Sequence, residues 1–197
     1  MYLSRPLVLV HGLWNTPRLF SRLKDRLNQP EELILAPHLP HQLGRASLRD
    51  LAAELDFQIH QRFSKEIFID ILGFSMGGLI SRIWLQEMNG FRRTRRFFSI
   101  GSPQKGTLTA QVVPKAIFAG IADMKLGSQL INSLNRFPTN LKSVHCRSYF
   151  SYSDLMVCPG YRAVLPYGPS ISIPVLTHKC LIMHSKSIDI LSQELLN

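Results

Sequence analysis

The stretch "ILGFSMGGLISRIW", residues 71–84, places Ser75 between Gly73 and Gly77 at the end of an apolar run. A serine held at a sharp strand-to-helix turn can act as a nucleophile, and glycines let neighbouring elements approach such a turn because they carry no Cβ. The backbone N–H of Met76, at the start of the following helix, can then bind a developing oxyanion. The stretch predicts a nucleophile elbow; the alternative is a glycine-rich turn that packs a helix on a strand.

A serine nucleophile needs a base and a carboxylate that orients the base. In strand–turn–helix sites of this kind the acid and the base both follow the serine along the chain. Asp154 comes directly after the strand-like segment 142–151, at the carboxyl end where a catalytic acid belongs. We therefore expect Asp154 to be the acid, with Asp123 as the alternative.

Three histidines follow the serine, and their positions differ. His145 lies inside a predicted strand, where a core or surface role is expected. His178 closes the strand-like segment 170–177 and opens the connection to the last helix, which is the position the base requires. His184 lies near the start of that helix, where we expect a partly buried neighbour of the site. We predict His178 as the base and keep His184 as the alternative.

A second oxyanion donor is expected from the loop after the first strand. In "VLVHGLW", His11 and Gly12 end the strand, so the N–H of Leu13 is the predicted donor, together with that of Met76. His11 precedes the serine in the chain, and we expect it to shape this loop and not to act as the base.

Elements with apolar patterns alternate between strand and helix along the chain. Strands are predicted at 6–11, 32–37, 66–74, 95–101, 142–151 and 170–177, and helices at 16–29, 47–63, 76–88, 127–135 and 185–197. Thr16 is the expected N-cap of the first helix, with Pro17 at its first position. The alternation predicts an α/β fold with a mainly parallel sheet of about six strands, covered by helices on both faces, in one domain spanning 1–197.

The composition, 45% hydrophobic and 18% charged, is typical of a globular protein. No apolar run approaches the ~20 residues of a membrane-spanning helix, and the first apolar run is shorter than that of a signal peptide. We therefore expect a cytoplasmic protein. Cys146, Cys158 and Cys180 lack metal-ligand spacing, so free thiols and no metal are expected.

The net charge of +10 favours contact with polyanions such as anionic lipid headgroups. The densest basic segment, "FRRTRRFF" at 91–98, is interpreted as a solvated turn entering a strand, with a partner site as the alternative. The chain shows no aromatic-stacking or helix-turn-helix signature, so a nucleic-acid partner is not expected. A monomer with peripheral contact to an anionic membrane surface is the expected state.

Four segments, "LVLVHGLW", "GFSMGG", "YSDLMV" and "HKCLIMHSKSIDIL", together resemble the α/β-hydrolase superfamily. More narrowly they are similar to the small lidless bacterial lipases and the lipase-like proteins of cyanobacteria. In those lipases a histidine precedes a short apolar run, a serine and the last helix, a pattern that falls on His178, 181–183 and Ser185. The resemblance implies a minimal α/β-hydrolase fold without a large cap, and hydrolysis of lipid or other acyl esters through an acyl-enzyme, without a cofactor.

Some expectations from the resemblance stay open. In those lipases small residues often follow the His-Gly pair, whereas this chain has Trp14 and Asn15 close after it. Trp14 could narrow the pocket or contact lipid. The segments 101–107 and 123–135 resemble the region that flanks the acyl pocket, while 112–124 is a lipid-facing lip or a core segment. The resemblance does not separate lipase, galactolipase, phospholipase, thioesterase and acyltransferase. A catalytically idle binding protein that keeps the fold is the alternative function.

Overall fold

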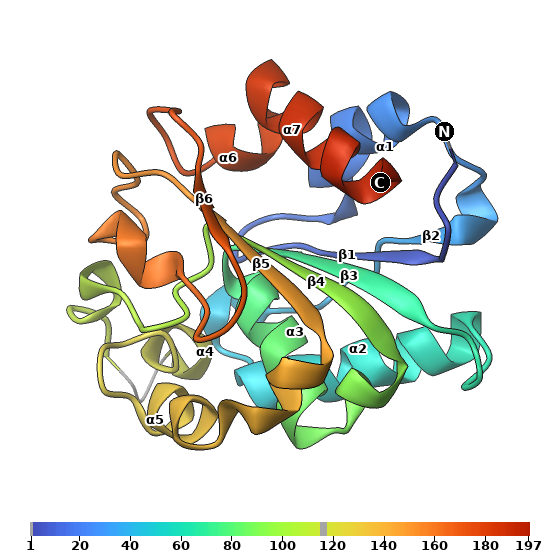
Figure 1. Cartoon of the computed structure of the whole chain (residues 1–197). Coiled ribbons are helices and arrows are strands. Elements are labelled where there is room, and N and C mark those ends of the chain that lie inside the picture. The colour runs from blue at the N-terminus through green and yellow to red at the C-terminus, as the bar shows by residue number, and fades with distance from the viewer. Residues whose placement is uncertain (1, 115–117) are drawn as a thin grey trace.

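The computed structural model describes residues 2–114 and 118–197, and within these ranges six strands form one sheet (Figure 1). The strand order is β2-β1-β3-β4-β5-β6, and every pairing is parallel. The strands are β1 (Leu7–Val10), β2 (Ile34–Leu35), β3 (Ile69–Phe74), β4 (Thr94–Ile100), β5 (His145–Phe150) and β6 (Ser170–Ser172). Because parallel strands end at the same edge, the loops that follow them lie together.

Helices cover both faces of the sheet. They are α1 (Ser21–Leu27), α2 (Leu48–Arg62), α3 (Met76–Glu87), α4 (Ala119–Ala122), α5 (Gln129–Arg136), α6 (Cys180–Met183) and α7 (Ser185–Leu196), with short 3₁₀ turns between them. In Figure 1, α1, α6 and α7 lie above the sheet and the other α-helices below it. The predicted fold class, a small α/β-hydrolase fold, is confirmed, and in the described part of the chain no large cap covers the sheet.

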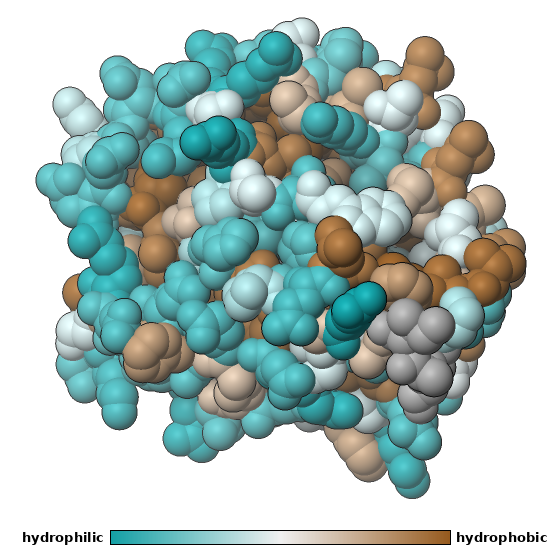
Figure 2. Space-filling view, turned by 180° about the vertical axis from the view of Figure 1, so that it is seen from behind, coloured by the Kyte–Doolittle hydropathy of each residue, from teal (hydrophilic) through white to brown (hydrophobic). Residues whose placement is uncertain are grey.

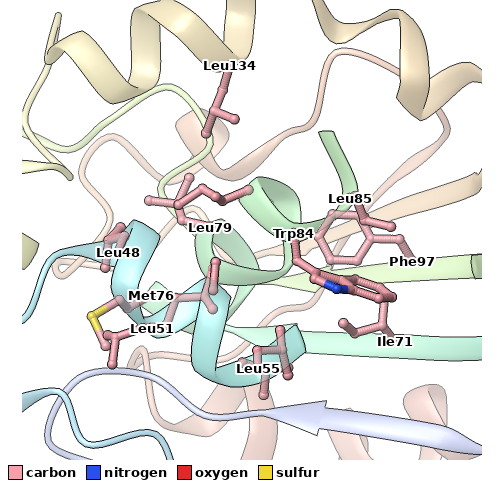
Figure 3. Packing of buried hydrophobic residues seen from close by; sticks show 14 of the residues in the cluster. Leu48, Leu51, Leu55, Ile71, Met76, Leu79, Trp84, Leu85, Phe97 and Leu134 are labelled. Carbon is pink, nitrogen blue, oxygen red and sulfur yellow. The ribbon is translucent and has the colours of Figure 1, made fainter. Parts of the chain in front are cut away.

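The side chains of the central strands alternate between two hydrophobic clusters. In β1, Val8 and Val10 point toward the cluster of α2 and α3, whereas Leu7 and Leu9 join the cluster of α1 and α7. Figure 3 shows the first cluster, in which Trp84 of α3 packs with buried neighbours from α3 and the sheet. Each fully buried aliphatic side chain contributes about 1.5–3 kcal/mol, so the two clusters hold the strand ends in fixed positions.

Two helix starts differ in their capping. Ser47 caps α2 because its side chain accepts a hydrogen bond from the Asp50 N–H at 3.2 Å. The predicted helix 16–29 instead begins with a 3₁₀ turn, Pro17–Phe20, and continues as α1. Thr16 is the N-cap residue and Pro17 the first residue of this turn, as predicted, although the Thr16 side chain makes no cap hydrogen bond.

Two predicted strands were too long. The segment 32–37 begins with a 3₁₀ turn, Glu31–Leu33, that leaves only Ile34–Leu35 to pair at the sheet edge. The segment 170–177 ends as a strand at Ser172, because the chain turns at Pro174: the Ile173 N–H still donates to the Phe150 carbonyl oxygen, but the Val175 N–H donates to the Ile173 carbonyl oxygen at 2.9 Å and not to the neighbouring strand. The helix α6 that follows was not predicted.

A buried arginine fixes α3 against the segments on its outer side. Arg82 donates to the carbonyl oxygens of Gln104, at 3.1 Å, and Leu134, at 2.8 Å, and to the side chain of Asn135 at 2.9 Å. Burial lowers the pKa of Arg82 to about 10. The helix that begins directly after Ser75 is therefore bound to the loop after β4 and to α5.

None of the helices in the described part of the chain combines the length and apolar character needed to cross a lipid bilayer.

Candidate active site

The predicted site residues gather at the edge where the strands end. Ser75 directly follows β3, and Leu13 lies in the loop after β1. Asp154 lies in the loop after β5, and His178 in the loop between β6 and α6. Since β6 is shorter than expected, His178 does not close a strand, but its loop still begins at the same edge.

The serine occupies a backbone conformation that few residues adopt. Ser75 has φ 55° and ψ −126°, and α3 begins at the next residue, Met76. Its N–H donates to the carbonyl oxygen of Ile100 in β4 at 2.8 Å. Such a conformation costs about 1–3 kcal/mol and persists only where the surroundings impose it. The bend therefore has the geometry of a nucleophile elbow.

Close backbone approaches surround this bend. A Cβ on Gly77 would lie 2.1 Å from the carbonyl oxygen of Val10, so the start of α3 rests directly on the end of β1. A Cβ on Gly12 would lie 2.8 Å from the Cβ of Ser75, and one on Gly73 would lie 2.5 Å from the Cα of Gly78. Each of these three positions requires glycine because any side chain would displace the elbow.

Asp154 and His178 form a direct hydrogen bond. The Oδ2 atom of Asp154 lies 2.7 Å from Nδ1 of His178, and the carboxylate is almost fully buried. The other oxygen, Oδ1, accepts from the N–H groups of Met156 at 2.8 Å and Val157 at 3.1 Å. Because Asp154 engages Nδ1, Nε2 is the ring nitrogen of His178 left for proton transfer.

The His178 ring is packed on two sides. Its centroid lies 4.8 Å from that of Phe74, the residue before the nucleophile. Gly101, at φ +52°, lies beneath it, and a Cβ there would approach Cε1 of His178 to 3.2 Å. Neither contact was predicted, although Gly101 opens the segment 101–107 that the resemblance had marked.

The loop that carries Asp154 is fastened to the loop after β4. Thr107 Oγ1 donates to the carbonyl oxygen of Met156 at 3.0 Å and accepts from the Cys158 N–H at 3.0 Å. Thr109 donates to the same Met156 oxygen at 2.6 Å. Thr107 therefore holds the turn that orients the carboxylate, a role that sequence reasoning missed because its partners lie about fifty residues away.

The loop after β1 presents a fixed peptide at the elbow. The Gly12 carbonyl oxygen accepts from Nδ1 of His11 at 3.0 Å and from the Asn15 N–H at 3.3 Å. A trans peptide directs its N–H opposite to its C=O, so these bonds also fix the direction of the Leu13 N–H. Trp14, at φ 58°, completes the tight turn.

His11 is fully buried behind this loop. Its Nε2 accepts from the Leu39 N–H at 3.2 Å, so both ring nitrogens are engaged by backbone groups. Burial lowers the pKa of His11, and the nearby His41 and His38 rings lower it further, against the Gly12 bond that raises it. The imidazole is therefore neutral at pH 7 and serves to shape the loop.

A cavity of about 320 Å³ opens at this edge, and Ser75 and His178 both line it. The rest of its wall is mostly apolar, with Leu13, Trp14, Phe74, Val113, Ile121, Met124 and Val157 among the lining residues. Of the predicted lip 112–124, Val112 is exposed, Ile121 and Met124 contribute to the cavity wall, and 115–117 lie outside the described residues. The described residues of that segment therefore include both exposed and buried positions.

The alternative residues lie elsewhere. Asp123 accepts a hydrogen bond from the Leu48 N–H through its carboxylate at 3.2 Å. His145 is exposed at the start of β5, at the opposite edge of the sheet. His184 caps α7 by accepting from the Lys186 N–H, and it is exposed and not partly buried as predicted.

The basic segment 91–98 lies at the amino end of β4, away from the serine. Arg93 donates to the carbonyl oxygens of residues 63, 64 and 67, and Arg96 pairs with Asp70, so two of its four arginines are structural. Arg95 lines a larger, polar hollow of about 800 Å³ at that edge. None of the predicted site residues lines it, so the smaller apolar cavity is the candidate active site.

Comparison with known proteins supports the fold described above. The family described as palmitoyl protein thioesterase matches residues 6–156, a range that includes Ser75 and Asp154 and ends before His178. No curated protein sequence matches the chain significantly.

Solved structures of ester hydrolases share the fold. Bacillus licheniformis lipase BlEst2 in its mature form has a TM-score of 0.71 at 16% identity, covering 98% of this chain and 92% of that one. The monoacylglycerol lipase of Paleococcus ferrophilus has a TM-score of 0.68 at 14% identity, with 98% and 96% covered. Aspergillus fumigatus lipase B has a TM-score of 0.77 at 15% identity, but this chain covers only 52% of it.

Proposed function

The chain belongs to the palmitoyl protein thioesterase family, and from this premise we propose that it cleaves acyl esters or thioesters with Ser75 as nucleophile, His178 as base and Asp154 as orienting acid. The family and the fold make it a hydrolase of the lipase and esterase kind.

One observation carries the proposal. The 2.7 Å hydrogen bond between Asp154 and Nδ1 of His178 lies beside an apolar cavity that Ser75 and His178 share. This bond keeps the hydrogen on Nδ1 and leaves Nε2 as an acceptor, which is the tautomer that can take a proton from a serine hydroxyl.

The reaction then runs in two halves. Ser75 Oγ attacks the acyl carbonyl carbon while its proton passes to Nε2 of His178, and Asp154 stabilises the resulting imidazolium. The tetrahedral intermediate collapses, the bond to the alcohol or thiol breaks, and His178 returns the proton to that leaving group. Water repeats the sequence on the acyl-enzyme, releasing the fatty acid and free Ser75.

The backbone N–H groups of Leu13 and Met76 would bind the oxyanion. Met76 is the first residue of α3, so its N–H is not used within the helix and lies at the positive end of the helix dipole. The Leu13 N–H is directed by the bonds that Gly12 accepts. A donor of this kind contributes about 3–4 kcal/mol to lowering the barrier.

The substrate class follows from the wall of the cavity. Its apolar lining accommodates an acyl chain and offers few groups to recognise a polar one. The family description names a thioesterase and the structural neighbours are lipases. A thiolate is a better leaving group than an alkoxide, so we expect turnover of both bonds, with the thioester cleaved faster.

A fluorophosphonate probe tests the nucleophile. We expect the wild-type chain to be labelled stoichiometrically and Ser75→Ala to remain folded and unlabelled. Hydrolysis of a short p-nitrophenyl ester should fall by on the order of 10³-fold or more in Ser75→Ala. A protein that binds lipid without catalysis would show neither labelling nor turnover, and near-normal turnover in Ser75→Ala would refute the assignment.

A further inference from the structure

Exposed apolar side chains concentrate at the edge that carries the cavity. The described loop residues that follow the strands at this edge span 11–16, 36–47, 101–114, 151–163 and 173–179, and we refer to them as the rim loops. Among the described residues, nine of the fifteen exposed large hydrophobic side chains belong to the rim loops, which make up less than a third of the chain: Trp14, Leu43, Leu108, Val112, Tyr152, Leu155, Met156, Tyr161 and Leu176. Figure 2 shows hydrophobic residues gathered along its right-hand edge, which corresponds to the left of Figure 1, where the strands end.

The rim loops are also almost free of negative charge. Their sequences contain one carboxylate, that of Asp154, which is buried against His178. The described lysines and arginines of these loops are Arg45, Lys105, Arg162 and Lys179, which come one each from the loops after β2, β4, β5 and β6. A surface that is both apolar and positively charged is unusual, because isolated exposed hydrophobic residues are normally surrounded by charges of both signs.

The opposite edge carries acidic as well as basic side chains. The segment 28–33 carries Glu31 and Glu32, and 63–68 carries Glu66 beside Lys65. Two of the arginines of the 91–98 segment are bound to protein groups, as described above. The described rim loops therefore carry four basic side chains against one buried carboxylate, whereas the opposite edge carries exposed charges of both signs.

From this arrangement we propose that the rim loops dock the protein on an anionic lipid bilayer, with the mouth of the cavity facing the membrane. Apolar side chains from separate loops would insert at the headgroup boundary, while Lys105 and Lys179 contact the headgroups. This inference rests on the proposed function in one respect only: it assigns the acyl substrate of Ser75 to a membrane lipid or membrane-held acyl group.

Charge and geometry favour a bilayer over a protein partner. Two of the exposed apolar side chains, Trp14 and Met156, line the cavity itself, so a fatty chain that leaves the bilayer at the rim loops can pass them to the wall formed by Ile121 and Met124. Lys179 also lines the cavity mouth, where it can contact an anionic headgroup while the acyl carbonyl reaches Ser75.

Vesicle co-sedimentation of the Ser75→Ala protein tests docking without hydrolysis. We expect strong binding to vesicles that contain phosphatidylglycerol, at least tenfold weaker binding to pure phosphatidylcholine, and loss of binding as salt rises from about 0.1 M to about 1 M. The triple change Val112→Ser, Leu155→Ser and Leu176→Ser, at side chains 87%, 77% and 81% exposed, should weaken binding at least tenfold. Lys105→Gln and Lys179→Gln should each weaken it about fivefold.

Matched changes at other places serve as controls. Phe57→Ser with Phe68→Ser removes exposed apolar side chains outside the rim loops, and Arg92→Gln with Arg95→Gln removes exposed charge at the opposite edge. We expect both pairs to bind vesicles as the parent does. Equal weakening by rim and control changes, or no binding to either vesicle, would overturn the proposal.

Activity separates this proposal from the proposed function. In a protein with Ser75 intact, the triple serine variant should hydrolyse a water-soluble short ester like the wild type and lose activity only on vesicle-borne ester. Vesicle binding without fluorophosphonate labelling would refute the function and leave docking standing. Labelling with no vesicle binding would do the reverse.

Discussion

At the scale of single residues, the hydrogen bonds around Asp154 determine which nitrogen of His178 can accept a proton. Two backbone N–H groups fix Oδ1, and this leaves Oδ2 directed at the ring. The ring itself cannot rotate freely, because Phe74 and Gly101 pack against it. On the proposed mechanism, Asp154 therefore acts by position as much as by charge.

The change Asp154→Asn tests this directly. The amide oxygen would still accept from the two N–H groups, so its NH₂ group would face Nδ1 of His178. That nitrogen must then act as acceptor, the hydrogen moves to Nε2, and the ring cannot take the proton of Ser75. We expect kcat to fall by on the order of 10³–10⁴-fold on a soluble ester, with an unchanged circular dichroism spectrum. A fall smaller than about tenfold would mean that Asp154 is not the orienting acid.

At the scale of the elements, two loops from neighbouring strands behave as one unit. The turn after β5 that carries Asp154 is bound to the loop after β4 through Thr107 and Thr109, and Leu108 N–H also donates to the Cys158 oxygen. The loop after β4 in turn contacts α3 through Gln104 and Arg82. Asp154 is thus connected to α3, the helix that begins directly after Ser75.

Thr107→Val should loosen this connection without changing the volume of the side chain. The Cys158 N–H would lose its acceptor, which costs about 1–3 kcal/mol where it stays buried, and the Asp154 turn would relax. We expect kcat on a soluble ester to fall about tenfold while KM stays within about twofold, as for a group that acts on the transition state alone.

Thr107→Ser is the matched control, because serine keeps the hydroxyl and loses only the methyl group. We expect it to restore kcat to near the wild-type value. Equal losses in the valine and serine variants would point to a packing defect and contradict the positioning role.

At the scale of the whole molecule, one buried ion pair joins the sheet to the last helix. Asp70 of β3 accepts from the Arg96 side chain at 2.6 and 2.9 Å and from its backbone N–H at 3.1 Å. The same guanidinium donates to the carbonyl oxygens of Glu194 and Leu195 at the end of α7. β3, β4 and α7 are therefore held together by a single charged contact far from the site.

Asp70→Asn would leave the Arg96 charge inside the protein without compensation. We expect the free energy of unfolding, measured by urea titration, to fall by about 3–5 kcal/mol. Asp189→Asn breaks an exposed pair with Arg26, whose side chains are 52% and 58% exposed, and should cost less than about 1 kcal/mol. Similar losses in the two variants would contradict a stabilising role specific to the buried pair.

Much of this architecture could be predicted from local patterns. Alternating apolar runs predicted the parallel sheet, and the carboxyl-end position of Asp154 predicted the edge on which it lies. The early end of β6 was also readable, because Pro174 stands inside the predicted strand. The burial of Arg96 was not, because it depends on the register that pairs Arg96 with Asp70, 26 residues earlier. Contacts such as Thr107 with Met156 leave no local pattern at all.

The order of the parts along the chain has a consequence for synthesis. Ser75 and its elbow belong to the first half of the sequence, whereas His178 lies beyond β6 and is followed by the helices that cover one face. A domain generally folds as a unit, so Ser75 leaves the ribosome well before His178 but meets it only after the last segment has been made. On the proposed mechanism the nascent protein is harmless to the membranes around it, and its chemistry begins only when the final segment folds into place.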